Sequence, residues 1–252
     1  HAIALGRRQM AAHPLHRILI HVVAHDARHN PELMFASIPE TLFNRSDVHF
    51  LVTYEASSDD GPFLLKAWLL ELNIWNVTLI QNRINQGYGG IQKIGFRVAI
   101  DGGYDCVVML HCDRHHSLEV LTDVLDGWLE HQPDVVLGSH MQSERGGIRN
   151  VINRVFTKFQ NVMTGWRLSE YRTSCRAYST SFLANVPFET NTNDFHFDTE
   201  ILLQAAHMRA SVREIPISHD YGDEVCRIAG LKHALSVVAS ILQFKMHQLG
   251  ML

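Results

Sequence analysis

Residues 105–116 read DCVVMLHCDRHH, and this stretch decides the fold because an apolar run ends abruptly in charged and imidazole side chains. A short apolar run without polar alternation predicts a strand buried on both faces, as in a parallel sheet. Working outward, the order of apolar run, polar loop and helical pattern occurs four times, and a fifth apolar run follows. The predicted strands are 17–24, 48–54, 76–81, 105–110 and 134–138, and the predicted helices between them are 31–39, 63–72, 91–102 and 118–130. Strands that alternate with helices predict an α/β fold, a three-layer sandwich with a mostly parallel sheet.

Polar loops follow the first four predicted strands, at 25–30, 55–61, 85–90 and 111–116. Ligands of open parallel sheets bind beyond the carboxyl ends of the strands. The four loops are therefore expected to converge on one crevice.

The second half of the chain has a different pattern. Its predicted elements are a helical stretch at 147–164, a short polar segment at 172–178, helices at 197–208 and 231–249, and an alternating strand at 211–217. The sequence has no internal repeat and no linker, so we expect one domain over 17–250, with halves at 17–116 and 117–250. Residues 1–16 lack the long apolar run of a secretory signal and are interpreted as a leader or an expression remnant.

The composition excludes several classes of protein. With 252 residues, a formal net charge of −4 and 46% hydrophobic residues, the chain is neither disordered nor built on a broad basic surface for nucleic acid. No stretch of about 18 apolar residues free of charge occurs, so no transmembrane helix is expected. The four cysteines have no CxxC spacing, which argues against a zinc ribbon or a disulfide framework and favours a reducing, cytoplasmic setting.

The densest group of candidate ligands follows the 105–110 run. In an extended chain, residues i, i+2 and i+4 share one side, so His111, Asp113 and His115 are expected to point into the crevice together. Imidazole with carboxylate suits Mn²⁺ or Zn²⁺, whereas Mg²⁺ prefers oxygen ligands. The segment therefore predicts a metal or phosphate site, and the alternative is a solvated, polar strand end.

The loop 85–90, NQGYGG, precedes a predicted helix. Glycine lets the backbone approach a ligand closely, and a helix N-terminus attracts phosphate. The loop is neither a Walker A motif nor GxGxxG, so a plain turn is the alternative. In the loops after the first two strands, His25, Asp26 and Glu55 are candidates for hydrogen bonds to a base or a ribose, with capping of the next helix as the alternative.

Two residues of the second half are candidates for chemistry. Arg176 lies among small and apolar residues in SCRAYS (174–179), and its guanidinium suits bidentate contact with phosphate. Glu170 shortly precedes it and is the best-isolated acid for a general base. The alternatives are a structural role for Arg176 and a surface helix cap for Glu170.

Taken in order, these motifs resemble the family 2 glycosyltransferases of the GT-A fold. The most similar group is that of the dolichyl- and polyprenyl-phosphate sugar transferases and their bacterial relatives. The resemblance runs over about 17–250, and its most specific stretches are NQGYGGIQKIGFRVAIDGGYDCVVMLHCD (85–113), LSEYRTSCRAYS (168–179), NDFHFDTEILLQ (193–204) and EIPISHDYGDE (214–224). It implies a nucleotide-sugar-binding half at 17–116 and an acceptor half at 117–250.

The resemblance further implies a UDP-, GDP- or dTDP-linked sugar donor, Mg²⁺ or Mn²⁺ as cofactor, and inversion at the anomeric carbon. Asp113 matches the second acid of the DxD motif and would hold the metal, with His115 and His111 as further ligands. The nucleotide-sugar-binding residues that the resemblance implies are Ala24, His25, Asp26, Glu55, Gly87, Gly89, Gly90, Lys93, Cys112 and His140.

On the acceptor side, the resemblance implies a lipid phosphate, such as a polyprenyl phosphate, or a glycan. Glu170 matches the acid before the acceptor-side arginine and would be the base for a hydroxyl acceptor, and Arg176 matches that arginine and would position a lipid phosphate. The expected catalytic residues of this hexosyltransferase-type enzyme are thus Asp113, Glu170 and Arg176. The helix predicted at 231–249 is expected to pack on the sheet, and its contact with the cytoplasmic face of a membrane or with a partner is the alternative. A homodimer is left open.

Two other functions also stay open at this point. Tyr54 and Glu55 replace the DD pair of the family, and His111 replaces the first Asp of DxD, so a non-catalytic nucleotide-sugar-binding module is one alternative. A metal-dependent hydrolase is the other, because 111–116 superficially resembles the HxHxDH motif of metallo-β-lactamase-like enzymes. The order of Asp and His is wrong for that motif, which makes the hydrolase the weaker interpretation.

Overall fold

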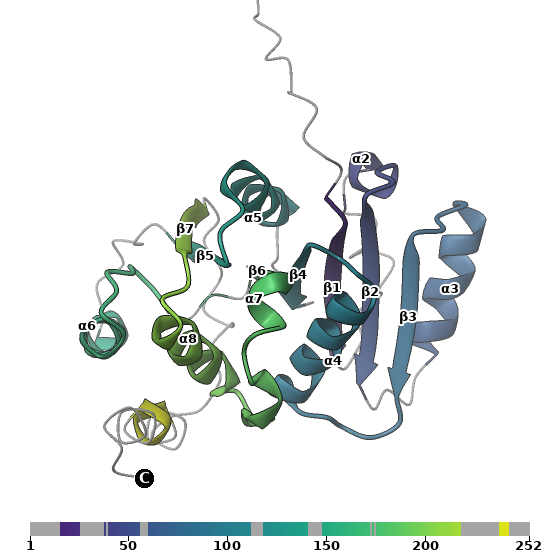
Figure 1. Cartoon of the computed structure of the whole chain (residues 1–252). Coiled ribbons are helices and arrows are strands. Elements are labelled where there is room, and N and C mark those ends of the chain that lie inside the picture. The colour runs from purple at the N-terminus through teal and green to yellow at the C-terminus, as the bar shows by residue number, and fades with distance from the viewer. Residues whose placement is uncertain are drawn as a thin grey trace, which may run out of the picture.

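A computed structural model describes residues 16–25, 38, 40–55, 60–111, 118–140, 148–171, 173, 175–217 and 237–241. Its centre is a seven-stranded sheet in the order β3-β2-β1-β4-β6-β5-β7, with helices packed against it (Figure 1). The strands are β1 (Ile18–His25), β2 (Val48–Glu55), β3 (Val77–Asn82), β4 (Cys106–His111), β5 (Val135–His140), β6 (Cys175–Ser179) and β7 (Val212–Ile217). The helices are α2 (Glu40–Phe43), α3 (Gly61–Glu71), α4 (Tyr88–Asp101), α5 (Leu118–His131), α6 (Ile148–Thr164), α7 (Thr180–Leu183), the 3₁₀ helix η1 (Phe188–Thr190) and α8 (Phe197–His207).

The mostly parallel sheet that the sequence predicts is confirmed. β1 pairs in parallel with β2 and β4, β2 with β3, and β5 with β7. Among the described strands, β6 alone runs the other way, because it lies between β4 and β5 and pairs antiparallel with both. The expectation of a short polar segment at 172–178 is wrong for β6, since all five of its residues are buried.

Alternation along the central strands divides the interior into two layers. On β1, Ile18, Ile20 and Val22 face a core that α3 and α5 cover, for example through Leu65 and Trp128. The neighbouring residues of the same strand, Leu19 and Val23, face a second core that α4, α7 and α8 cover. Because both faces of the strand are covered, the sequence 18–24 is apolar apart from the buried His21 and does not alternate.

Most of the predicted helices are confirmed, with small shifts of their ends. The helices expected at 63–72, 91–102, 118–130, 147–164 and 197–208 correspond to α3, α4, α5, α6 and α8. The loop expected at 85–90 is shorter than predicted, because α4 begins at Tyr88. The helix expected at 31–39 lies outside the described residues except for residue 38, and only 237–241 of the helix expected at 231–249 is described. Val237 and Ile241 pack there on Leu203 of α8, next to Phe156 and Phe159 of α6. Within the described ranges, no helix has the length and apolar character needed to cross a membrane.

The parallel pairing brings the carboxyl ends of the strands to one edge of the sheet, as the sequence predicts. The register aligns His25 with Glu55, Glu55 with Asn82, and Val23 with His111. The chain therefore leaves β1, β2, β3 and β4 from neighbouring points. Because β6 runs in the opposite direction, the segment that leads into it, including Glu170, reaches the sheet at the same edge.

Candidate functional site

The backbone places several predicted site residues along this carboxyl edge. Four of them are the last residues of their strands, namely His25 of β1, Glu55 of β2, His111 of β4 and His140 of β5. Ala24 directly precedes His25. The predicted site residues that lie outside the described part of the chain are Asp26, Cys112, Asp113 and His115.

The predicted metal ligands begin at the end of β4. Asp113 follows His111 by two residues, and β4 lies beside β1 near the middle of the sheet. Of the side chains that the structure describes, no three from His, Cys, Asp and Glu are grouped so as to hold a metal ion. The donor set His111, Asp113 and His115 has the imidazole and carboxylate chemistry that suits Mn²⁺, and it follows the carboxyl end of a parallel strand, where ligands of such sheets bind.

The glycine-rich loop packs against the segment that leads into α8. Gly87 precedes α4 with φ +76°, and a Cβ there would lie 2.6 Å from the carbonyl oxygen of Asn193. A Cβ on Gly89 would lie 2.4 Å from the carbonyl oxygen of Thr192. The amide of Gly89 donates to the Asn193 carbonyl at 2.8 Å. The first two glycines are therefore required for backbone contact inside the protein, a reason that sequence reasoning did not consider.

Lys93 of α4 secures the same contact. Its ammonium Nζ donates to the carbonyl oxygens of Asn191 and Glu189, the latter at 3.2 Å, and to Oδ1 of Asn193 at 2.8 Å. Nζ also lies 5.9 Å from the centre of the Phe197 ring. The structure thus bonds the Lys93 ammonium to protein groups, and the contact with a nucleotide predicted for Lys93 stays a prediction.

A buried polar cluster around Asp198, the second residue of α8, joins α4, α8 and β6. The Tyr88 hydroxyl donates to Oδ2 of Asp198 at 2.7 Å, and the Gln92 amide donates to Oδ1 at 2.9 Å. Nη1 of Arg176 lies 2.7 Å from Oδ1 of Asp198. The second arm of the guanidinium, Nη2, donates to the carbonyl oxygen of Tyr171 at 3.1 Å. With only 3% of its surface exposed, Arg176 is held by protein groups on both arms.

The electrostatics of this cluster keep the guanidinium of Arg176 charged. Burial has the largest single effect and disfavours the charged guanidinium, but Asp198, Tyr178 and Tyr88 together outweigh it, so the pKa of Arg176 lies above its ordinary value. Tyr88 as a residue is half-buried, and burial of its hydroxyl, followed by the charge of Asp198, raises its pKa well above the ordinary value. Burial also raises the pKa of Tyr178 to about 12, against the opposing effect of Arg176. Both phenols therefore stay neutral and Tyr88 stays a hydrogen-bond donor.

The segment 168–171, which carries the candidate base Glu170, is fixed from several sides. The amide of Ser169 donates to the Glu214 carboxylate of β7 at 2.8 Å, and the amide of Glu170 donates to it at 3.2 Å. Asn161 of α6 bonds both the amide and the carbonyl of Leu168. Glu170 is half-buried. Its backbone is held firmly, which suits a group that must meet a substrate in one position.

Sequence reasoning missed Asp198, Tyr88, Gln92 and Glu214 as parts of this arrangement. Asp198 and Tyr88 lie in stretches that carry the family resemblance, but they are 110 residues apart and nothing local shows that they meet. The sequence signal was weak, because Asp198 stands beside Thr199 and Glu200 in the polar first turn of FDTEILLQ. A buried carboxylate requires a partner, and Arg176 is that partner.

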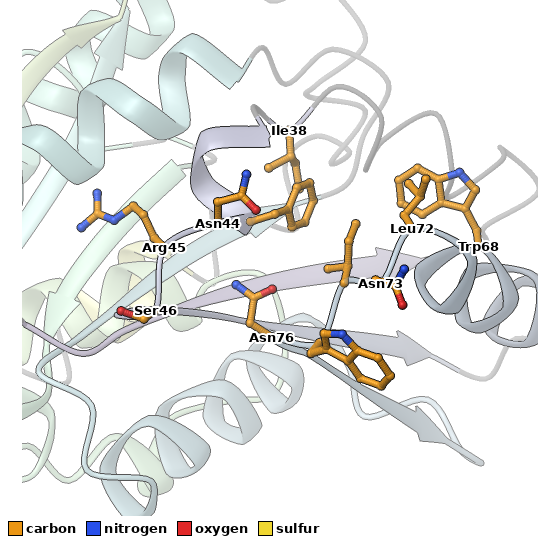
Figure 2. A pocket seen from close by; sticks show the side chains of 11 residues that line it. Ile38, Asn44, Arg45, Ser46, Trp68, Leu72, Asn73 and Asn76 are labelled. Atoms are coloured by element: carbon orange, nitrogen blue, oxygen red, sulfur yellow. The ribbon is translucent and has the colours of Figure 1, made fainter.

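A cavity of about 670 Å³ lies at the other edge of the sheet (Figure 2). Its walls come from the end of α2, the end of α3 and the loops that precede β2 and β3, with Trp68 and Leu72 on one side and Asn44 and Arg45 on another. Arg45 is paired with Asp47 at 2.6 Å. None of the residues that line this cavity belongs to the predicted site, because the cavity is at the amino ends of the strands.

Comparison with known proteins agrees with the sequence motifs. The family model for Glycosyl transferase family 2 matches residues 22–186. A curated relative, the undecaprenyl-phosphate mannosyltransferase of Micrococcus luteus, is 24% identical over 151 residues, which are 57% of this chain and 60% of that protein. This chain therefore spans about three-fifths of the length of that relative.

Two solved structures share the fold. Glucosyl-3-phosphoglycerate synthase from Mycobacterium tuberculosis, in complex with UDP, is 13% identical with a TM-score of 0.64, and the match covers 91% of this chain and 80% of that chain. A mannosyltransferase from Pyrobaculum calidifontis, in complex with GDP-Man and Mn²⁺, is 17% identical with a TM-score of 0.56, and the match covers 80% of this chain and 55% of that chain. These likenesses confirm the GT-A α/β fold that the sequence predicts.

Proposed function

Since the chain belongs to glycosyl transferase family 2, we propose that it moves a hexose from a nucleotide-sugar donor to an acceptor with inversion at the anomeric carbon. The observation that carries this proposal is the common edge at which β1, β2 and β4 end, because the family match at 22–186 covers all three strand ends. The predicted donor-side residues follow these ends directly, where ligands of parallel sheets bind.

On the donor side, we propose that the nucleotide lies across the ends of β1 and β2 and beside the start of α4. Asp26 and Glu55 would accept hydrogen bonds from the base or the ribose, and His140 would contact the donor from the end of β5. The backbone supports this placement, since His25 and Glu55 are paired in register at the edge. The neighbours in complex with UDP and with GDP-Man make these two nucleotides the first to test.

We propose that Asp113, together with His111 and His115, holds a divalent ion, Mn²⁺ or Mg²⁺. Solved neighbours contain Mn²⁺, and the donor set fits that ion. When bound, such an ion neutralises the negative charge that develops on the leaving diphosphate. In this proposal, the protein contributes one carboxylate and two imidazoles after the end of β4, next to the donor.

On the acceptor side, we propose a polyprenyl phosphate, because the curated relative is named for undecaprenyl phosphate. A phosphate acceptor is already anionic and needs no base. If the acceptor is a hydroxyl instead, Glu170 is the proposed base, since it is half-buried in a fixed segment at the edge where the strands end.

The experiment is a thermal-shift panel followed by a transfer assay. The purified protein is heated with UDP-glucose or GDP-mannose, each with Mn²⁺, with Mg²⁺ or with a chelator. A donor at a hundred times its Kd stabilises the folded state by about 2.7 kcal/mol, so one pair of nucleotide and metal should raise the melting temperature clearly. Transfer is then measured to undecaprenyl phosphate and to phosphoglycerate.

Asp113→Ala is the decisive variant, and Asp101→Ala is its matched control, because Asp101 is exposed at the far end of α4. We expect Asp113→Ala to abolish the metal-dependent part of the thermal shift and to lower transfer about 10²–10³-fold. An unchanged metal-dependent shift in Asp113→Ala would refute the metal assignment. If neither nucleotide sugar raises the melting temperature of the unmodified chain, the proposed donors are wrong. Binding of a nucleotide sugar without transfer would favour the non-catalytic binding module.

A further inference from the structure

We propose that Asp198 is a positioning residue of the transfer reaction. Through its ion pair with Arg176, Asp198 fixes the position of the segment 168–171 relative to the start of α4. The inference rests on the proposed function, because it takes α4 as the donor side and Glu170 as the acceptor side of the site. It requires neither Asp198 nor Arg176 to touch a substrate, and it replaces the direct contact with the acceptor expected for Arg176.

The Asp198 carboxylate is shared between two elements that border the site. Tyr88 and Gln92 reach it from the first two turns of α4, and Tyr88 itself belongs to the glycine-rich stretch 85–90. Arg176 reaches it from β6, between β4 and β5. An ionised carboxylate accepts on both oxygens, whereas an amide or a hydroxyl in its place would bring a donor of its own toward these donors. The arrangement is therefore specific for an acid.

Arg176 carries the connection onward to the candidate base. One arm of its guanidinium is at Asp198 and the other is at the carbonyl oxygen of Tyr171, the residue after Glu170. The guanidinium is planar and rigid, so fixing one arm fixes the direction of the other. The position of the Tyr171 carbonyl is thereby tied to α4 through two consecutive side chains.

Loss of Asp198 would leave the Arg176 charge buried without its anionic partner. A buried charge without a partner is costly, so the guanidinium would move toward another acceptor or toward water, and the bond to the Tyr171 carbonyl would change with it. A displacement of about 1 Å at a reacting group lowers a rate about a hundredfold. The effect of the substitution should therefore appear in catalysis and not only in stability.

The remaining contacts of the segment keep it folded when this bond is lost. Glu214 can still accept from the amides of Ser169 and Glu170, and Asn161 can still bind Leu168, but these bonds are expected to open more often without the bond to the Tyr171 carbonyl. The Tyr171 hydroxyl also donates to Oδ1 of Asn161 at 2.9 Å. The segment is thus expected to shift or loosen, while the sheet around it keeps its structure.

The test compares three variants, Asp198→Asn, Arg176→Lys and Tyr88→Phe, with the matched control Tyr104→Phe. Tyr104 precedes β4 and therefore lies at the amino ends of the parallel strands, away from the proposed site. Arg176→Lys keeps the charge but cannot bridge two acceptors as a fork. Two measurements are made on the full chain. One is hydrogen–deuterium exchange of the amides at 168–171 without substrate. The other is kcat with the KM for donor and for acceptor, using the pair that the transfer assay identifies.

We expect Asp198→Asn and Arg176→Lys to speed exchange at 168–171 at least about tenfold, with unchanged exchange in β1, β2 and β4. We expect kcat to fall about 10- to 100-fold or the acceptor KM to rise as much, with the donor KM within about twofold. Tyr88→Phe should give a smaller change in the same direction, and it serves as the mild variant should Asp198→Asn fail to fold. Tyr104→Phe should change none of these quantities.

Unchanged exchange at 168–171 in folded Arg176→Lys and Tyr88→Phe would overturn the proposal. A donor KM that rises in parallel with the acceptor KM would overturn it as well, because a general structural loss has that signature. The exchange measurement needs no substrate. If the unmodified chain transfers no sugar, the proposed function fails by itself, and the coupling of Asp198 to 168–171 is still decided by exchange.

Discussion

His21 is completely buried on β1, and its ring fits beneath α4 because Gly95 has no side chain. A Cβ on Gly95 would lie 2.0 Å from Nδ1 of His21, far inside van der Waals contact. Nε2 of His21 lies 2.8 Å from the hydroxyl oxygen of Thr53, which connects the ring to β2. At this residue of α4, glycine is therefore a requirement of packing on the sheet.

We predict that Gly95→Ala lowers the free energy of unfolding by about 1–3 kcal/mol, the usual cost of overpacking, despite the higher helix propensity of alanine. Gly90→Ala in the same helix is the matched control, because the atom nearest to its Cβ would be Cβ of Gln86 at 3.1 Å. Urea unfolding measures both variants. Equal losses at the two positions would contradict the packing argument.

His49 gives the stability of the fold a dependence on pH. Burial, followed by the positive charge of Arg17, holds the pKa of His49 below its ordinary value of 6.5. As the pH falls below 6.5, the unfolded chain binds a proton at His49 before the folded chain does. The contribution of neutral His49 to stability is therefore complete above this pH and is lost as the pH drops toward the folded-state pKa.

We predict that His49→Gln loses less stability than the unmodified chain when the pH is lowered from about 7.5 to about 5.5. Glutamine has no titrating group, and its amide can replace the bond between Nε2 of His49 and the Thr78 hydroxyl at 2.8 Å. His131→Gln, at the exposed end of α5, is the control. The prediction would be wrong if urea unfolding gave parallel pH profiles for His49→Gln and the unmodified chain.

At the scale of elements, α3 places two consecutive leucines in opposite surroundings. Leu65 is completely buried in the core that α5 also covers, whereas Leu64 is 48% exposed. We predict that Leu65→Ala lowers the free energy of unfolding by about 2–5 kcal/mol, because it leaves a cavity in that core, and that Leu64→Ala costs less than about 1 kcal/mol. Chemical denaturation of the two variants gives the comparison, and similar losses would show that α3 does not pack as described.

Elements with a strong local pattern could be predicted from the sequence, and β6 could not. The apolar runs of β1 and β4 and the periodic pattern of α5 carry their own signal in consecutive residues. β6 is five residues long and includes Arg176 and Ser179, so its sequence predicts a polar segment and not a buried strand. It is a strand because β4 and β5 pair with it on both sides, and its arginine is tolerated there because Asp198 neutralises it.

At the scale of the whole molecule, the shared edge of the site was predictable because it follows from topology alone. Parallel strands that alternate with helices must end at one edge, so the positions of His25, Glu55 and His111 required no knowledge of their contacts. The cluster around Asp198 depends on contacts between residues distant in the chain, such as the 110-residue separation of Tyr88 from Asp198, and these are specified only by the completed packing.

β6 also determines when the sheet can be completed during synthesis. Within the described sheet it is the element that joins β4 to β5, and it follows both of them along the chain. When β5 has left the ribosome, neither of the strands that pair with it has yet emerged. Translation adds roughly 5–20 residues per second, so several seconds pass before β6 and then β7 emerge. The nascent protein therefore passes through an interval with three unpaired strand edges, one of β4 and both of β5, and in this period chaperone binding and aggregation compete with completion of the sheet.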